Sequence, residues 1–132
     1  MPQGGEKPEN SIEVTVHCNI RSGNLLAHLP DAQQAEVVQV LLEQPGSVRI
    51  ERIVSQGQVT PEGAWYDQDH EEWVLLLTGA AELQLADEVV ARRLEPGDWL
   101  HLPAYCRHRV VWTAPEQETV WLAMHWKQDK EA

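Results

Sequence analysis

The chain has 132 residues and a formal net charge of -11 at pH 7, from 21 acidic and 10 basic side chains. This length suits one ordinary domain that buries roughly two thirds of its unfolded surface. The acidic balance disfavours nucleic acid and anionic membrane surfaces as partners, because both would repel the chain at long range.

The N-terminal residues 1–10 are polar and lack the apolar core of a signal peptide, and no later apolar run is long enough to cross a bilayer. We therefore expect a cytoplasmic protein. In a reducing compartment, Cys18 and Cys106 are expected to be free thiols.

In chain order, residues 1–10 hold too little apolar surface to offset the entropy of ordering, which predicts a flexible tail. Residues 11–20 alternate Ile12, Val14 and Val16 with polar side chains, as in a half-buried strand. A second short extended piece is expected at 24–29.

A helix is predicted between Asp31 and Pro45. Asp31 stands where an N-cap residue should be, with Gln34 three residues later, and Gly46 follows Pro45 as a stop signal. Apolar residues recur between these signals at helical spacing: Ala35, Val38, Leu41 and Leu42.

The rest of the chain has the pattern of short strands separated by Gly, Pro and Asp turns, which predicts an all-β barrel or sandwich. The expected strands are 47–54, 59–64, 72–78, 81–86, 89–94, 99–102, 107–113 and 119–126. In 73–77 the residues that point to either face of the strand are apolar, so both faces should be covered. One face would meet the barrel interior, and the other would meet the helix or a second subunit.

Two motifs in this region resemble those of the cupin superfamily. The first cupin motif has two histidines one residue apart, then a glutamate, then a glycine, and Glu72 and Gly79 match its last two positions. Its histidine positions fall on Tyr66 and Gln68, whereas His70 lies between them and Glu72.

The second cupin motif has glycine, proline, glycine and histidine. Gly97, Pro103 and His108 match it, and Tyr105 replaces its second glycine. The resemblance spans 47–126.

The resemblance implies a double-stranded β-helix, the RmlC-like jelly-roll barrel, with one N-terminal helix. The barrel would occupy 47–127, with a strand and helix from 11–46 packed outside it and a tail at 128–132. A homodimer is expected, partly from the apolar strand 73–77 and partly because the family commonly dimerises.

The resemblance also implies one divalent transition metal inside the barrel, such as Zn, Fe, Ni or Mn. Glu72, His108 and Gln68 are the expected ligands. Tyr66 would ligate well only as phenolate, which its ordinary pKa near 10 opposes. His125 or His70 could complete the set.

Three functions are compatible with these residues. One is a metal-dependent oxygenase or isomerase acting on a small polar molecule. The second is a metal-free isomerase or epimerase in which Tyr66 and either His125 or His108 form an acid and base pair. The third is a non-catalytic module that binds or senses a small ligand.

In all three cases Gln68 and tryptophans would contact the ligand, and the expected wall residues are Trp65, Trp112 and Trp121. The strand residues Arg49, Arg52 and Arg92 could recognise an anionic ligand if they pointed inward, although strand arginines are more often solvated.

Overall fold

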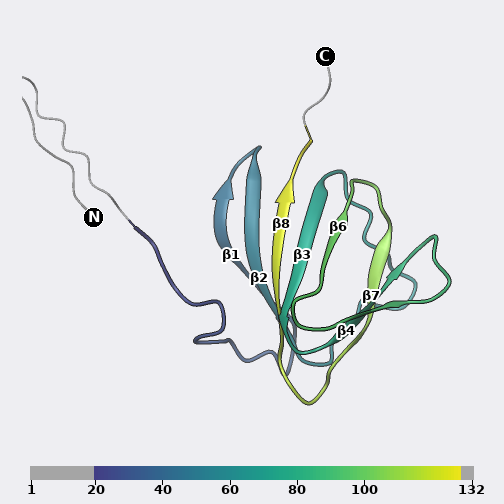
Figure 1. Ribbon diagram of the computed structural model, residues 1–132, viewed down its shortest axis with the longest axis horizontal. Coiled ribbons are helices and arrows are strands. Elements are labelled where there is room, and N and C mark those ends of the chain that lie inside the picture. The colour runs from purple at the N-terminus through teal and green to yellow at the C-terminus, as the bar shows by residue number, and fades with distance from the viewer. Residues whose placement is uncertain (1–19, 129–132) are drawn as a thin grey trace, which may run out of the picture.

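The structure is a computed structural model that describes residues 20–128, in which all regular elements are strands (Figure 1). Two antiparallel sheets form, which confirms the predicted all-β class. The larger sheet has the order β1 (Val37–Gln44), β2 (Val48–Ser55), β8 (Thr119–Trp126), β3 (Glu71–Thr78) and β6 (Trp99–Leu102). The smaller sheet has the order β5 (Arg92–Leu94), β4 (Ala81–Leu85) and β7 (His108–Thr113).

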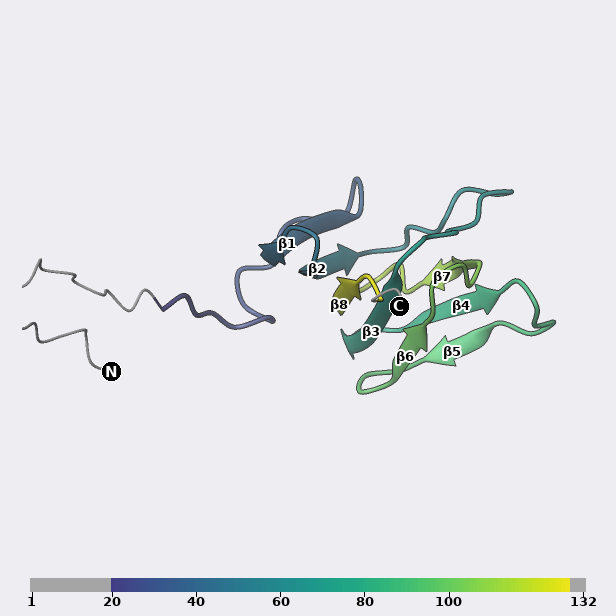
Figure 2. The ribbon, with the colours of Figure 1, turned by 90° about the horizontal axis from the view of Figure 1, so that it is seen from above.

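The hydrophobic core lies between the two sheets. Figure 2 shows the smaller sheet beside β3 and β6. Strand β1 lies at the opposite edge of the larger sheet, farther from the smaller sheet. The core consists of buried side chains from both sheets: Val74, Leu76, Ala81, Leu83, Leu94, Trp121 and Ala123. These core residues occupy inward-facing positions that alternate along the strands. At one end of the barrel, the inward-facing side chains of the same strands are polar instead.

The central strand β3 is covered on both faces, as its sequence predicts. Val74 and Leu76 belong to the inner core, whereas Leu77 packs outside it against a cluster formed by Ala32, Val54 and Val120. The residues just before β1 therefore cover the outer face near Leu77.

The predicted helix between Asp31 and Pro45 is wrong, because the chain forms strand β1 there. Asp31 caps a turn instead, since its Oδ1 accepts a hydrogen bond from the Gln33 amide two residues on (2.9 Å). Long-range pairing with β2 supplies the backbone partners of β1, and a bulge between Val40 and Leu42 interrupts its alternation. That interruption gives the apolar residues a spacing that looks helical.

Other differences concern the N-terminal segment. The expected extended piece at 24–29 contains a turn, in which the Ala27 amide donates to the Asn24 carbonyl (3.1 Å). The guanidinium of Arg52 fastens this turn to β2 through the carbonyls of Leu25 and Ala27. Since β1 is part of the larger sheet, that sheet begins before residue 47.

Two expected strands are shorter or absent: 59–64 is a loop, and only 92–94 of the segment 89–94 is a strand. The predicted tail at 1–10 and nearly all of the predicted strand 11–20 lie outside the described residues, as do residues 129–132. Within 20–128, the structure has no helix with the length and apolar character of a transmembrane span.

Candidate functional site

A cavity of about 240 Å³ opens at the polar end of the barrel. We call it the Glu72 cavity after the carboxylate near its centre. Its apolar wall includes Val74, Leu83, Leu102 and Trp121, which continue into the core. The polar lining comes from both sheets and from the segments before β1 and β3: Glu36, Arg49, Glu51, Tyr66, Gln68, Glu72, His108 and His125.

The carboxylate of Glu72 lies between two imidazoles. Its Oε1 is 3.7 Å from Nε2 of His108, and its Oε2 is 3.9 Å from Nε2 of His125. The amide nitrogen of Gln68 donates a hydrogen bond to Oε1 (2.9 Å). Glu72, His108 and His125 are all buried. The carboxylate of Glu72 is therefore held in a fixed position with little contact with solvent.

The orientation of His108 is set by its neighbours. Its Nδ1 donates a hydrogen bond to the carbonyl oxygen of Cys106 (2.9 Å), because a carbonyl can only accept. In the neutral ring, Nε2 then carries the lone pair and faces Glu72. The ring also stacks on Tyr66, with centroids 5.3 Å apart and planes at 26°. His108 is therefore presented to the cavity as an acceptor.

Tyr66 stands beside His108 because a backbone bridge joins them, with the Tyr66 amide 2.7 Å from the His108 carbonyl. Burial raises the pKa of the Tyr66 phenol above its usual value of 10.0, and the carboxylates of Glu36 and Glu72 raise it further, while a hydrogen bond with Thr60 offsets part of this increase. The phenol therefore stays protonated at neutral pH and can donate a hydrogen bond to a ligand.

On the other side of Glu72, His125 bonds to Glu51. Its Nε2 donates to Oε1 of Glu51 (3.1 Å), and Nε of Arg49 lies 2.8 Å from Oε2 of the same carboxylate. The hydrogen bond from His125 is the main cause that lowers the pKa of Glu51, with Arg49 contributing. Glu51 is thus ionised at neutral pH.

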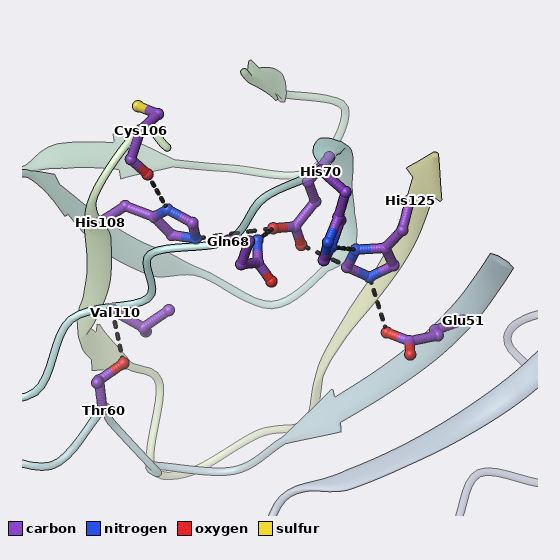
Figure 3. A network of polar contacts seen from close by, with 9 residues as sticks. Glu51, Thr60, Gln68, His70, Cys106, His108, Val110 and His125 are labelled. Atoms are coloured by element: carbon purple, nitrogen blue, oxygen red, sulfur yellow. Dashed lines mark hydrogen bonds and ion pairs between the residues drawn. The ribbon is translucent and has the colours of Figure 1, made fainter. Parts of the chain in front are cut away.

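His70 extends this arrangement towards the surface. Its Nε2 lies 3.0 Å from Nδ1 of His125, and its Nδ1 lies 3.5 Å from the exposed carboxylate of Asp69. Figure 3 shows the resulting row of polar side chains, from His108 through Gln68 and His125 to Glu51. Both ring nitrogens of His125 are therefore occupied by protein partners.

Six of the eight predicted site residues line the Glu72 cavity, and two do not. The structure turns Trp65 and Trp112 to the outside, where Trp65 lies under the guanidinium groups of Arg107 and Arg109. The six that line the cavity are Tyr66, Gln68, Glu72, His108, Trp121 and His125.

Strand register explains both misplaced tryptophans. A bulge opposite Glu82 and Leu83 reverses the alternation in β7, so Trp112 faces outward although His108 and Val110 face inward. Trp65 precedes Tyr66, and neighbouring residues in extended chain point to opposite sides.

The roles of Glu51 and Glu36 were not predicted from the sequence. Glu51 lies between Arg49 and Ile53 on the inward face of β2, so the inward set of this strand carries two charged side chains. That pattern is a detectable signal. Glu36 precedes β1 and could not be found while this segment was interpreted as a helix.

The expected metal site fits only in part. His108 and Glu72 are close enough to share an ion, and the bond from His108 Nδ1 to a carbonyl is common for metal-bound histidines. However, Gln68 turns its amide nitrogen, not its oxygen, towards Glu72.

The other expected ligands take part in other interactions in this structure. Burial raises the pKa of the Tyr66 phenol, which opposes ligation as phenolate, and both nitrogens of His125 contact protein partners. Among the described residues, no group of three or more His, Cys, Asp or Glu is arranged to hold a metal ion. This donor set falls short of the three protein ligands that catalytic zinc sites use.

The comparisons with solved structures identify the family. A protein from Ralstonia eutropha JMP134, provisionally named a mannose-6-phosphate isomerase, is 46% identical, with a TM-score of 0.79 over 83% of this chain and 100% of that chain. A cupin superfamily protein from Desulfitobacterium hafniense DCB-2 is 17% identical, with a TM-score of 0.66 over 83% of this chain and 94% of that chain.

An RmlC-like cupin protein from Desulfovibrio desulfuricans is 20% identical, with a TM-score of 0.63 over 80% of this chain and 96% of that chain. These last two similarities concern the fold alone. No protein-family model and no curated protein matches the chain. Together with the jelly-roll topology, the matches show that the chain belongs to the cupin superfamily.

Proposed function

We propose that this cupin is a small-molecule isomerase that moves a proton between neighbouring carbons of a hydroxy-carbonyl compound. The observation that carries the proposal is the buried Glu72 carboxylate, which lines a cavity and lies between the imidazoles of His108 and His125. A buried carboxylate beside a protonated phenol and an imidazole lone pair offers a base, a donor and an acceptor together.

In this mechanism Glu72 takes the proton from the carbon next to the carbonyl. The protonated Tyr66 gives its proton to the carbonyl oxygen, while Nε2 of His108 accepts the proton of the neighbouring hydroxyl. The product of these transfers is an enediolate, with a proton on the former carbonyl oxygen and the negative charge on the neighbouring oxygen. Glu72 then returns its proton to the former carbonyl carbon, and the oxygen deprotonated by His108 becomes the new carbonyl. Transfer of one proton from the His108 imidazolium to the Tyr66 phenolate, through solvent, restores the protein.

His125 and Glu51 have a positioning role in this proposal. They touch each other, and His125 also lies beside Glu72, which is directly opposite it in the pairing of β3 with β8. The name of the Ralstonia protein supports the reaction type, since it describes an isomerase acting on a sugar.

Hydrogen exchange provides the test, because it detects removal of the proton whichever isomer forms afterwards. Mannose, glucose, fructose and their 6-phosphates would each be incubated with the protein in D2O, and proton NMR would follow loss of the signal from hydrogen next to the carbonyl. We expect exchange with at least one of these sugars. We also expect Glu72→Gln to slow it by about 100-fold or more, as for removal of a general base.

Glu71→Gln is the matched control. Glu71 is the preceding residue in β3, but its carboxylate points away from the cavity to His101 (2.7 Å). The control should exchange at the wild-type rate. Equal rates for the Glu72 and Glu71 variants, or no exchange by the wild type, would contradict the proposal. Binding of a sugar without exchange would favour a non-catalytic module instead.

A further inference from the structure

From the charges around the Glu72 cavity, we infer that its substrate is an uncharged polyhydroxy carbonyl compound, and that a phosphorylated sugar is rejected. This inference rests on the proposed function and names its substrate class. It differs from the substrate in the name of the Ralstonia protein, which is a sugar phosphate.

Three carboxylates and one guanidinium line the cavity, belonging to Glu36, Glu51, Glu72 and Arg49. Even with both lining histidines protonated, the formal charge of the lining would only reach zero. A phosphate monoester carries a charge of about -1.5 to -2 at pH 7, so it would meet repulsion from each carboxylate. A neutral sugar avoids this repulsion and can use the same oxygens as hydrogen-bond acceptors.

The single arginine of the lining gives one of its donors to a carboxylate of the same cavity. Nε of Arg49 lies 2.8 Å from Oε2 of Glu51, and Glu51 lies on the inward face beside it. A phosphate bound by the remaining donors of Arg49 would lie close to the carboxylate of Glu51 and would be repelled by it. Recognition of phosphate usually depends on arginines whose donors are open to a bidentate contact.

The other strand arginines that could have recognised an anion are committed elsewhere. Arg52 binds Gln39 and two carbonyls of the segment before β1. Arg92 forms a two-point contact with Glu88, at 2.7 and 2.9 Å. Neither residue lines the cavity.

The size of the cavity agrees with a small ligand. Its volume of about 240 Å³ lies below the roughly 300 to 1,000 Å³ that is typical of sites for larger ligands. A compact sugar needs less of this space than its phosphate ester does.

Calorimetric titration of the full chain with mannose and with mannose 6-phosphate tests the inference. We expect Kd for the phosphate to exceed Kd for the neutral sugar at least tenfold at low salt. The ratio should fall in 0.5 M NaCl, because the Debye length shortens from about 10 Å at 0.1 M to a few ångströms.

Two variants test the electrostatic cause. Glu51→Gln removes a carboxylate and releases Arg49, so it should tighten binding of mannose 6-phosphate severalfold. Glu36→Gln removes a carboxylate while leaving the pair of Arg49 and Glu51 intact, and should tighten it less. Glu116→Gln, in an exposed loop outside the cavity, makes the same change in net charge and should leave the ratio of the two Kd values unaltered.

Each outcome decides the inference. Equal or tighter binding of the phosphate, or no binding of either sugar, overturns it. If the phosphate is both bound and exchanged through Glu72, the inference fails while the proposed isomerase stands. Preferential binding of the neutral sugar without hydrogen exchange supports the inferred ligand class and contradicts the isomerase.

Discussion

Gly79 ends β3 in a conformation that only glycine accepts easily. Its φ is 91°, and a Cβ atom there would lie 2.5 Å from the Cα of Thr119. We expect Gly79→Ala to destabilise the fold by about 3 kcal/mol or more, because backbone strain and overpacking add. Urea denaturation measures the change.

Tyr105 provides the comparison, since it occupies the position where the second cupin motif has a glycine. Its φ is 65°, and 70% of the residue is exposed. Tyr105→Gly should change stability by no more than about 1 kcal/mol, because relieved strain and added chain entropy oppose each other. Similar losses for Gly79→Ala and Tyr105→Gly would contradict this account of the two turns.

Individual site residues could be predicted from the sequence where a motif fixes both residue type and spacing. Glu72 and His108 were predicted from such spacings, and both line the cavity. Glu51 was not predicted, because its role depends on the pairing of β2 with β8, which brings it 3.1 Å from His125. Pairing between distant strands has no local signature.

The contact between β2 and β8 makes stability depend on pH. The hydrogen bond from His125, and secondly Arg49, keep the pKa of Glu51 below its ordinary value of 4.5. The unfolded chain therefore binds this proton at a higher pH than the folded chain. The contribution of Glu51 is complete above the unfolded pKa and is lost as the pH falls through the lowered one.

We expect Glu51→Gln to cost about 1 kcal/mol at pH 7, allowing for partial screening by solvent. The difference from the wild type should shrink towards zero as the pH falls below the folded pKa. Urea midpoints between pH 7 and pH 3 test this. A difference that stays constant or grows in acid would rule out the assigned pair.

Strand β1 shows why element type was misjudged. Local capping signals and apolar spacing favoured a helix, yet β1 makes seven register pairs with β2. Tertiary pairing overrides weak local propensity, and the bulge obscures the period of two residues. Most of the later strands were predicted because turn residues separate them at regular intervals, although 59–64 is a loop and β5 is shorter than expected.

For the whole molecule, we expect the homodimer that the sequence suggested, formed through β1. Within residues 20–128, β1 has a neighbouring strand on one side only, and Val38, Val40 and Leu42 are 50%, 52% and 43% exposed. An unpaired edge bearing apolar side chains favours pairing with a second copy.

Light scattering after gel filtration should give about twice the chain mass of 15.0 kDa. Val40→Lys should yield monomers. Val89→Lys, at a site 95% exposed between β4 and β5, introduces the same charge away from β1 and should remain dimeric. A monomeric wild type, or a dimer that tolerates Val40→Lys, would contradict the interface.

We propose that the side chains of the Glu72 cavity transfer protons without a bound metal. Elemental analysis of protein purified without added metal, combined with the hydrogen-exchange rate before and after EDTA, tests it most directly. We expect far less than one transition metal per chain and an unchanged exchange rate. One metal per chain that disappears in His108→Ala, with exchange abolished by EDTA, would contradict it.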